Sequence, residues 1–290
     1  MMHSSSLNIL KDNLALLNER KTISSEQYLL TLTDIAKNVC EDSRFTDVSE
    51  VCETYRSCVG QRSYLTEKML YDAVLKTPRL FADVKALLSI GSNDQASEVS
   101  QGKIAYLKNK FNDLAYEKLS KYTEHATPVF VDSPQEACEA VANGVAEMCI
   151  LPIENSRDGK LFGFYGMLNK FDLKITTVCN IITEDDLSSI KYALISRKCE
   201  DPWERDLSKK HYVFEFSTLS TNADFLEDLM AFARECNALP LTVDSKPIQY
   251  DPQLKRYILS FLLKTSYEFL MYPPLMLTGY SPIGFYPNEF

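Results

Sequence analysis

Ile150-Leu151-Pro152-Ile153-Glu154-Asn155-Ser156 joins an apolar run to three consecutive polar side chains. The apolar run, residues 148–151, predicts a short buried strand. We expect this strand to end at Pro152, because proline cannot donate a hydrogen bond to a sheet ladder. In open α/β sheets, ligands bind just outside the carboxyl ends of the strands, where Glu154, Asn155 and Ser156 would then lie.

A structural interpretation fits the same stretch. Asparagine and serine are good helix caps, and Asp158-Gly159 is a common turn pair. Taken alone, the residues therefore leave two alternatives, a ligand-binding strand end or a turn followed by a capped helix.

The context of the stretch adds a resemblance. Pro152-Ile153-Glu154-Asn155-Ser156 resembles the substrate-binding signature of prephenate dehydratases, and it follows an expected helix, an Asn143-Gly144 stop and a strand in that family's order. The resemblance implies an α/β domain of the periplasmic-binding-protein type over residues 103–200. It also implies a catalytic role for Glu154 and substrate binding by Asn155, Ser156 and Gly159.

Two departures from the family pattern stand out. The family's glycine-rich first turn is replaced by residues 108–113, which contain no glycine; glycine is what lets backbone amides approach an anion closely. Residues 181–189 then run almost directly into Ile190-Lys191-Tyr192, which resembles the family's Thr-Arg-Phe triplet, so the domain is expected to be truncated and to lack the second lobe. Lys191 is the second expected catalytic residue, as a cation for a substrate carboxylate. Ile190 cannot donate a proton.

Residues 208–290 resemble the ACT regulatory domain of the same family, a ferredoxin-like α+β fold. Expected strands at 211–216, 239–243 and 257–263 and a helix at 223–236 support this assignment. The implied effector site, by likeness to the family's Glu-Ser-Arg-Pro and Gly-Ala-Leu motifs, consists of Asn222, Ala223, Asp244, Ser245, Lys246 and Pro247. The alternative for 244–247 is a plain exit from a strand into a turn.

The first 91 residues are expected to be helical, and the polar residues 92–102 to form a linker. Some prephenate dehydratases carry a helical chorismate mutase there, an enzyme that needs inward-facing cations to clamp carboxylates. The candidate cations are Arg20, Lys21, Lys37, Arg44 and Arg56. The alternative is an interaction or dimerisation bundle with ordinary surface charge.

Composition narrows the possible partners and cofactors. The net charge of −9 argues against binding to nucleic acid or to anionic membrane surfaces. There is no apolar run of about 18 residues and no signal-peptide pattern, so we expect a cytoplasmic protein. The 8 cysteines are scattered and the 3 histidines lie far apart, so neither a metal site nor a cofactor is expected.

Three functional hypotheses follow. The first is a divergent prephenate dehydratase relative in L-phenylalanine metabolism with weak or no dehydratase activity, which binds an aromatic ligand (prephenate or L-phenylalanine) or a partner protein. The second is an active dehydratase, a carbon–oxygen lyase converting prephenate to phenylpyruvate, carbon dioxide and water, with or without a fused mutase-like N-terminus. The third is a different chemistry on prephenate or chorismate, carried by the N-terminal helices. A homodimer is expected under the first two, because ACT domains pair through exposed sheet edges.

Overall fold

The structure is a computed structural model, and it describes residues 7–14, 25–60, 63–88, 102–182, 188–197, 202–207, 209–265 and 267–288. The chain divides into two compact units. One comprises Met1–Leu88 and Leu270–Leu277, and the other comprises Ser89–Phe269 and Thr278–Phe290. Of the expected linker at 92–102, Gly102 is described and residues 92–101 lie outside the described residues.

The described part of the first unit is helical, as expected for the first 91 residues. Residues 7–14 are helical, and the further helices are α2 (Ser25–Glu41), α3 (Val48–Val59), α4 (Tyr64–Lys76), α5 (Pro78–Leu88) and most of α10 (Glu268–Met276). Asp47 caps α3, and Ser63 forms a capping box with Thr66 at the start of α4. Helix α5 begins at Pro78, where a missing amide hydrogen costs nothing. The apolar faces of these helices bury side chains such as Ile35, Tyr55 and Leu70 completely.

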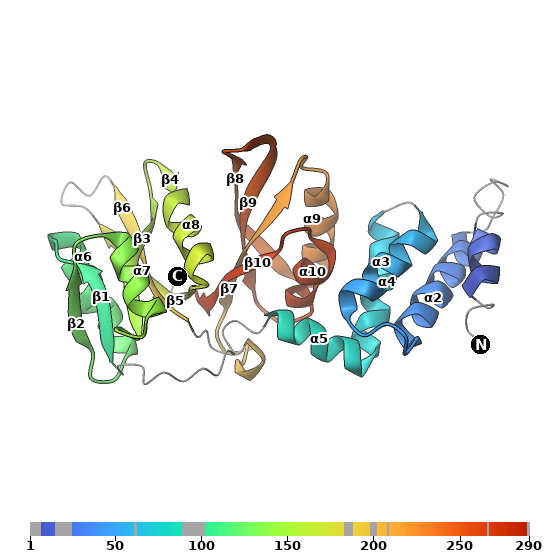
Figure 1. Cartoon of the computed structure of the whole chain (residues 1–290), viewed down its shortest axis with the longest axis horizontal. Coiled ribbons are helices and arrows are strands. Elements are labelled where there is room, and N and C mark those ends of the chain that lie inside the picture. The colour runs from blue at the N-terminus through green and yellow to red at the C-terminus, as the bar shows by residue number, and fades with distance from the viewer. Residues whose placement is uncertain are drawn as a thin grey trace. The chain divides into compact units, whose positions relative to one another are not determined.

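The second unit is built on one continuous mixed sheet (Figure 1). Its strands are β1 (Lys103–Leu107), β2 (Thr127–Val131), β3 (Met148–Asn155), β4 (Gly159–Lys160), β5 (Lys174–Ile182), β6 (Ser189–Ser196), β7 (Tyr212–Ser220), β8 (Ala238–Ile248), β9 (Asp251–Leu263) and β10 (Ser281–Pro287). The order across the sheet is β2-β1-β3-β6-β5-β10-β7-β9-β8, and β4 pairs with β3.

Helices cover both faces of the first part of this sheet. One buried cluster joins Ala115 and Leu119 of α6 (Lys110–Leu119) to β1, β3, β5 and β6. A second cluster on the other face includes side chains of α7 (Pro134–Ala142) and α8 (Phe162–Phe171). The expected α/β fold class is thereby confirmed.

The alternation of strands and helices in the sequence predicts a mainly parallel sheet, and this prediction is wrong beyond β3. Strands β1, β2 and β3 are parallel, but β6 runs antiparallel to both β3 and β5. The physical reason is the short connection between Ile182 and Ser189, because a parallel neighbour would need a crossover of a dozen or more residues.

The expected strand end at Pro152 is also wrong. Strand β3 continues to Asn155, and its register with β6 shifts between Pro152 and Glu154. A proline can stay within a strand at such an irregularity, because the ladder does not need its missing donor there. Ile153 pairs on the opposite side, where its carbonyl accepts a hydrogen bond of 2.9 Å from the Leu161 amide.

Residues 212–287 have the β-α-β-β-α-β order of ferredoxin-like folds, with α9 (Phe225–Glu235) and α10 as the helices. The strand order β10-β7-β9-β8 is antiparallel throughout. Phe214 and Phe216 of β7 contact aromatic rings that include Phe269 and Phe261. Val213 points to the opposite face of β7 and belongs to the buried cluster that includes side chains of α8.

Candidate functional site

The end of the motif forms a tight hairpin between β3 and β4, with Asn155 opposite Gly159. The Asn155 side-chain oxygen accepts a hydrogen bond of 2.9 Å from the Arg157 amide, and its carbonyl accepts one of 3.2 Å from the Asp158 amide. Gly159 has a φ of +74°, a conformation that side chains rarely adopt. Two of the expected substrate-binding residues therefore shape the turn.

Ser156 ties the same hairpin to the start of β6. Its amide donates to the Ser189 carbonyl at 2.9 Å, and its hydroxyl oxygen accepts from the Ser189 amide at 2.9 Å. The third expected substrate-binding residue is thus hydrogen-bonded to the backbone of β6. The turn of the structural alternative is present, but its helix cap is wrong, because α8 begins after Leu161 without a side-chain cap.

The two expected catalytic residues lie together. Lys191 is paired with Glu154 in the ladder between β6 and β3, and its Nζ lies 2.9 Å from Glu154 Oε2. The two side chains are 26% and 27% exposed, so the ion pair is reachable from solvent. Lys191 is consequently already neutralised by a protein carboxylate.

A cavity of about 270 Å³ lies beside this ion pair. It is bordered by strands of the first part of the sheet and by the face of the ferredoxin-like strands opposite the aromatic cluster. Its lining residues are Ile153, Glu154, Lys160, Val178, Lys191, Val213, Leu241, Thr242, Ser260, Tyr286 and Asn288.

Behind the cavity lies a buried polar network that our sequence analysis missed. Lys160, directly after the turn glycine, forms an ion pair with Glu215 of β7. The Tyr165 hydroxyl donates to Glu215 Oε1 at 3.0 Å, and the Tyr286 hydroxyl donates to Glu215 Oε2 at 2.9 Å. Glu215 has no exposed surface, so both carboxylate oxygens are satisfied inside the protein.

The network sets the protonation of its members. Burial alone would raise the pKa of the Glu215 carboxyl, but the charge of Lys160 and the hydrogen bonds from Lys160, Tyr286 and Tyr165 outweigh burial and hold this pKa below its usual value. Burial, followed by the Glu215 charge, raises the pKa of Tyr165 and of Tyr286 well above that of a free phenol. The tyrosines therefore stay protonated as donors.

One sequence signal could have pointed to Glu215. It interrupts an otherwise apolar and aromatic run, Tyr212 to Phe216, as its only charged member. Alternation along a strand assigns such a residue to a solvent-facing side, but here Lys160, Tyr165 of α8 and Tyr286 of β10 contact it on that side.

Residues 108–113, which stand where the family has a glycine-rich turn, form hydrogen bonds with one another and with the end of β1. Asn109 caps α6 by accepting from the Asn112 amide at 2.9 Å, and the Asn112 side-chain amide donates to the Leu107 carbonyl at 2.7 Å. The Lys108 ammonium lies 4.9 Å from the centre of the Phe130 ring. Lys108, Asn109 and Asn112, which stand where a substrate would be held, therefore contact other groups of the protein.

The expected effector residues are divided between two faces of the ferredoxin-like sheet. Ser245 is paired with Tyr257, whose hydroxyl donates to the Asn222 carbonyl at 3.2 Å, beside Ala223. Asp244 and Lys246 point to the other face, because successive strand residues alternate.

The other two residues of this candidate motif are Lys246 and Pro247. The Lys246 ammonium lies 5.8 Å from the centre of the Phe162 ring of α8. Pro247 is exposed and, like the other three, lies within β8 rather than in a turn. The four residues thus do not form one surface.

Comparisons with known proteins bear on the first half of the second unit. Residues 104–200 match the family model described as "Prephenate dehydratase". This prephenate dehydratase-like segment runs from β1 to just beyond β6 and contains both Glu154 and Lys191. No curated protein sequence matches the chain.

Solved structures extend the likeness in fold. A structure described as "GqqA- a novel type of quorum quenching acylases" has 14% identity and a TM-score of 0.54, and the match covers 64% of this chain and 95% of that one. Prephenate dehydratase from Streptococcus mutans has 16% identity and a TM-score of 0.52, with 64% and 97% covered. Prephenate dehydratase in complex with L-Phe from Arthrobacter aurescens has 11% identity, a TM-score of 0.49, and 64% and 90% covered. The first two of these structures have TM-scores above 0.5 and show a shared fold, and fold does not carry activity with it.

Two further findings concern metals and membranes. Among the described residues, no group of three or more histidine, cysteine, aspartate or glutamate side chains is placed to hold a metal ion. None of the helices in the described ranges is both long and apolar enough to cross a bilayer.

Proposed function

We propose that this chain is a divergent prephenate dehydratase relative of aromatic amino-acid (L-phenylalanine) metabolism, with weak or no dehydratase activity, which acts by binding an aromatic ligand or a partner. The ion pair between Lys191 and Glu154 carries this proposal. A lysine already neutralised by glutamate is a poor clamp for a ligand that carries only carboxylates, because such a ligand would leave Glu154 without a cation when it displaced it.

The chemistry of dehydration adds a second argument. The ring hydroxyl must receive a proton as carbon dioxide leaves, and the site must exclude water and fix its donors. Ile190 stands where the family triplet has a hydroxyl, and the connection from Ile182 to Ser189 is too short for a second lobe. The chain therefore offers one wall of a cleft.

The alternative is an active prephenate dehydratase. It is supported by the convergence of Glu154 and Lys191 and by the family match that spans both.

We infer that the helical unit does not supply a mutase site.

The cations of the helical unit support that inference. Lys37 lies 3.9 Å from Glu41, the guanidinium of Arg44 is bonded to Asp42, and that of Arg56 lies 2.9 Å from Glu67. These contacts fit an interaction bundle better than a carboxylate clamp. Arg20 and Lys21, the other two candidate cations, lie outside the described residues.

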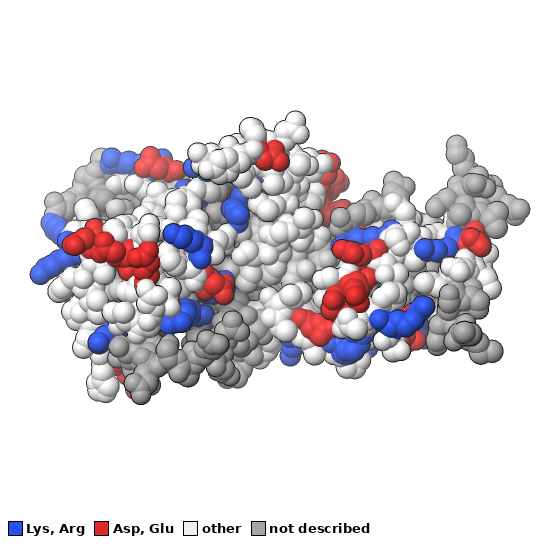
Figure 2. All heavy atoms as spheres, in the orientation of Figure 1, with Lys and Arg blue, Asp and Glu red and all other residues white. Residues whose placement is uncertain are grey.

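For the ferredoxin-like half we propose an ACT-like regulatory role and a homodimer in the cytoplasm, with domain boundaries at 1–91, 103–200 and 208–290. Strand β8 ends the sheet and exposes Leu239, Leu241 and Val243. An apolar edge strand is a ready partner for a second copy of itself. Figure 2 shows acidic and basic side chains interspersed on the face drawn, which gives no support to a nucleic-acid partner.

The test is direct conversion of prephenate by the full-length protein, followed as phenylpyruvate formation. The proposal predicts little or no product above the uncatalysed rate, and the same rate for Glu154→Ala. Turnover that disappears in Glu154→Ala would overturn the proposal and establish the dehydratase alternative. Thermal unfolding provides the binding arm, because a ligand at a hundred times its Kd stabilises by about 2.7 kcal/mol.

A further inference from the structure

We propose that the cavity beside Glu154 and Lys191 binds one α-amino acid as its zwitterion, with the ammonium group on Glu154 and the carboxylate on Lys191. This inference rests on the proposed function, since it gives the ligand-binding role a site and a ligand class. A cavity that binds a zwitterion is expected to discriminate against a dicarboxylate such as prephenate.

The charge balance of the cavity favours a zwitterion over a dianion. Two ammonium groups line it, those of Lys160 and Lys191. Lys160 is neutralised from behind by Glu215, and Lys191 by Glu154 at the cavity wall. The sum is zero, so a dianion would be desolvated without compensation, whereas a zwitterion adds no net charge.

The ion pair between Glu154 and Lys191 can open to admit a ligand, whereas the pair between Lys160 and Glu215 stays closed. Glu154 and Lys191 are each about a quarter exposed, and ion pairs in such a position contribute little to stability. An amino acid can insert between them and exchange one ion pair for two charge-assisted contacts. The Lys160–Glu215 pair is buried and shares its carboxylate with two tyrosines, so it stays closed and serves as a fixed wall.

The size and lining of the cavity fit one amino acid with an apolar side chain. At about 270 Å³ the cavity has the liquid volume of about nine water molecules, taking about 30 Å³ for each. That is room for one free amino acid and too little for a folded peptide segment. Ile153, Val178, Val213 and Leu241 give it an apolar wall, so an apolar side chain is favoured over a charged one.

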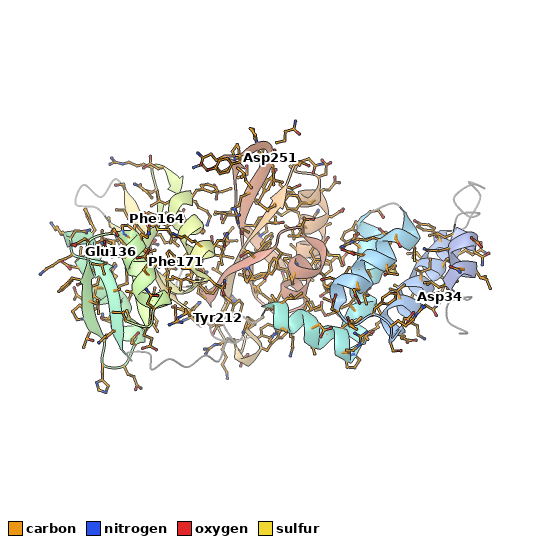
Figure 3. The ribbon with its side chains drawn as sticks, viewed as in Figure 1. Asp34, Glu136, Phe164, Phe171, Tyr212 and Asp251 are labelled. Carbon is orange, nitrogen blue, oxygen red and sulfur yellow. The ribbon has the colours of Figure 1, made fainter. Side chains whose placement is uncertain are left out.

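Two hydroxyl groups add to the polar part of the cavity lining, which also includes Tyr286 and Asn288. Thr242 and Ser260 lie opposite each other on β8 and β9, with their hydroxyl oxygens 2.6 Å apart. One hydroxyl donates to the other, so the pair still has one O–H with which to donate to a ligand. Figure 3 labels Phe164 and Phe171 of α8, the helix that follows the β3–β4 hairpin in the chain.

The experiment is calorimetric titration of the full-length protein with L-phenylalanine, L-leucine, phenylpropionate, phenethylamine and prephenate. Phenylpropionate lacks the ammonium group and phenethylamine lacks the carboxylate, so each removes one of the two proposed contacts. We expect L-phenylalanine or L-leucine to bind at least tenfold more tightly than the other three compounds. Equal binding of phenylpropionate and L-phenylalanine, or binding of prephenate alone, would overturn the inference.

Two charge variants locate the site. Glu154→Gln and Lys191→Met should each weaken binding of the amino acid at least tenfold, and the control variant Lys37→Met, in an exposed ion pair of the helical unit, should leave it unchanged. Unfolding curves of the unliganded variants show that they are folded. If both variants bind normally while Asp244→Ala or Ser245→Ala does not, the cavity is not the site and the proposed function still stands. If the wild type converts prephenate at an enzymatic rate, the proposed function fails whatever the titrations show.

Discussion

Lys160 and Glu215 form a buried ion pair that joins the β3–β4 hairpin to the centre of the ferredoxin-like sheet. The side chain of Lys160 is 5% exposed and that of Glu215 is 0% exposed. Lys160 lies within the segment that matches the family model and Glu215 lies outside it. The pair therefore fixes the candidate ligand-binding hairpin against a part of the chain that the match does not include.

Replacing only the acid should be strongly destabilising. Glu215→Leu leaves the Lys160 charge buried without its carboxylate and deprives Tyr165 and Tyr286 of their acceptor. Removing one partner of a buried pair costs about 3–5 kcal/mol. Urea unfolding should show a loss of this size, and a loss below about 1 kcal/mol would contradict the described network.

A double variant provides the control for this measurement. Lys160→Met combined with Glu215→Leu removes both charges, and the combined loss should be smaller than the sum of the two single losses, because the residues are in contact. The exposed pair Lys37–Glu41 is the matched surface case. Lys37→Met should change the free energy of unfolding by less than about 0.5 kcal/mol.

Acid should weaken the fold through Glu215. Its pKa in the folded protein lies below the usual value, whereas in the unfolded chain it is about 4.3. The stabilisation is therefore fully present above the unfolded pKa and is lost as the pH falls through the folded pKa. Between about pH 5 and pH 3 the wild type should lose stability more steeply than the Lys160→Met/Glu215→Leu variant, measured by urea unfolding at each pH. Parallel pH profiles would show that Glu215 is not linked to folding.

Much of the fold could be predicted because local periodicity decides it. The helices of the first unit follow from apolar spacing and from caps such as Asp47 and Ser63. Strand β1 and helix α7 follow from an apolar run and from Ser133-Pro134 at a helix start. In each case the signal and the structure it predicts lie within the same short segment.

The site could be predicted only in part, because its decisive contacts join distant segments. Glu154 and Lys191 were expected at one site and are indeed paired. The contact between Lys160 and Glu215 spans 55 positions in the chain, and no local pattern encodes it. Helix α10 was not expected because it contains Pro273 and Pro274, and proline strongly lowers helix propensity. Only tertiary packing can compensate for this cost, and packing cannot be read from the local sequence.

Gly284 is a position where the continuous sheet tolerates no side chain. A Cβ there would lie 2.7 Å from the Ile175 carbonyl oxygen and 2.8 Å from the Ile175 Cβ, where β10 meets β5. Gly284→Ala should therefore destabilise by about 1–3 kcal/mol through overpacking. The control is Gly166→Ala in α8, where the new Cβ meets nothing within 4 Å and helix propensity should stabilise by about 1 kcal/mol. Thermal unfolding of both variants checks the opposite signs, and equal shifts would contradict this packing.

Ser156→Ala distinguishes the two interpretations of the motif. In the structure the Ser156 hydroxyl oxygen accepts from the Ser189 amide, so its removal should lower the free energy of unfolding by about 0.5–1.5 kcal/mol. Affinity for L-phenylalanine should stay within about twofold of wild type, because the hydroxyl serves the backbone of β6 rather than a ligand. Ser156→Thr retains the hydroxyl and should recover most of the lost stability. A loss of affinity in Ser156→Ala without a loss of stability would instead assign this serine to ligand binding, as the family resemblance implies.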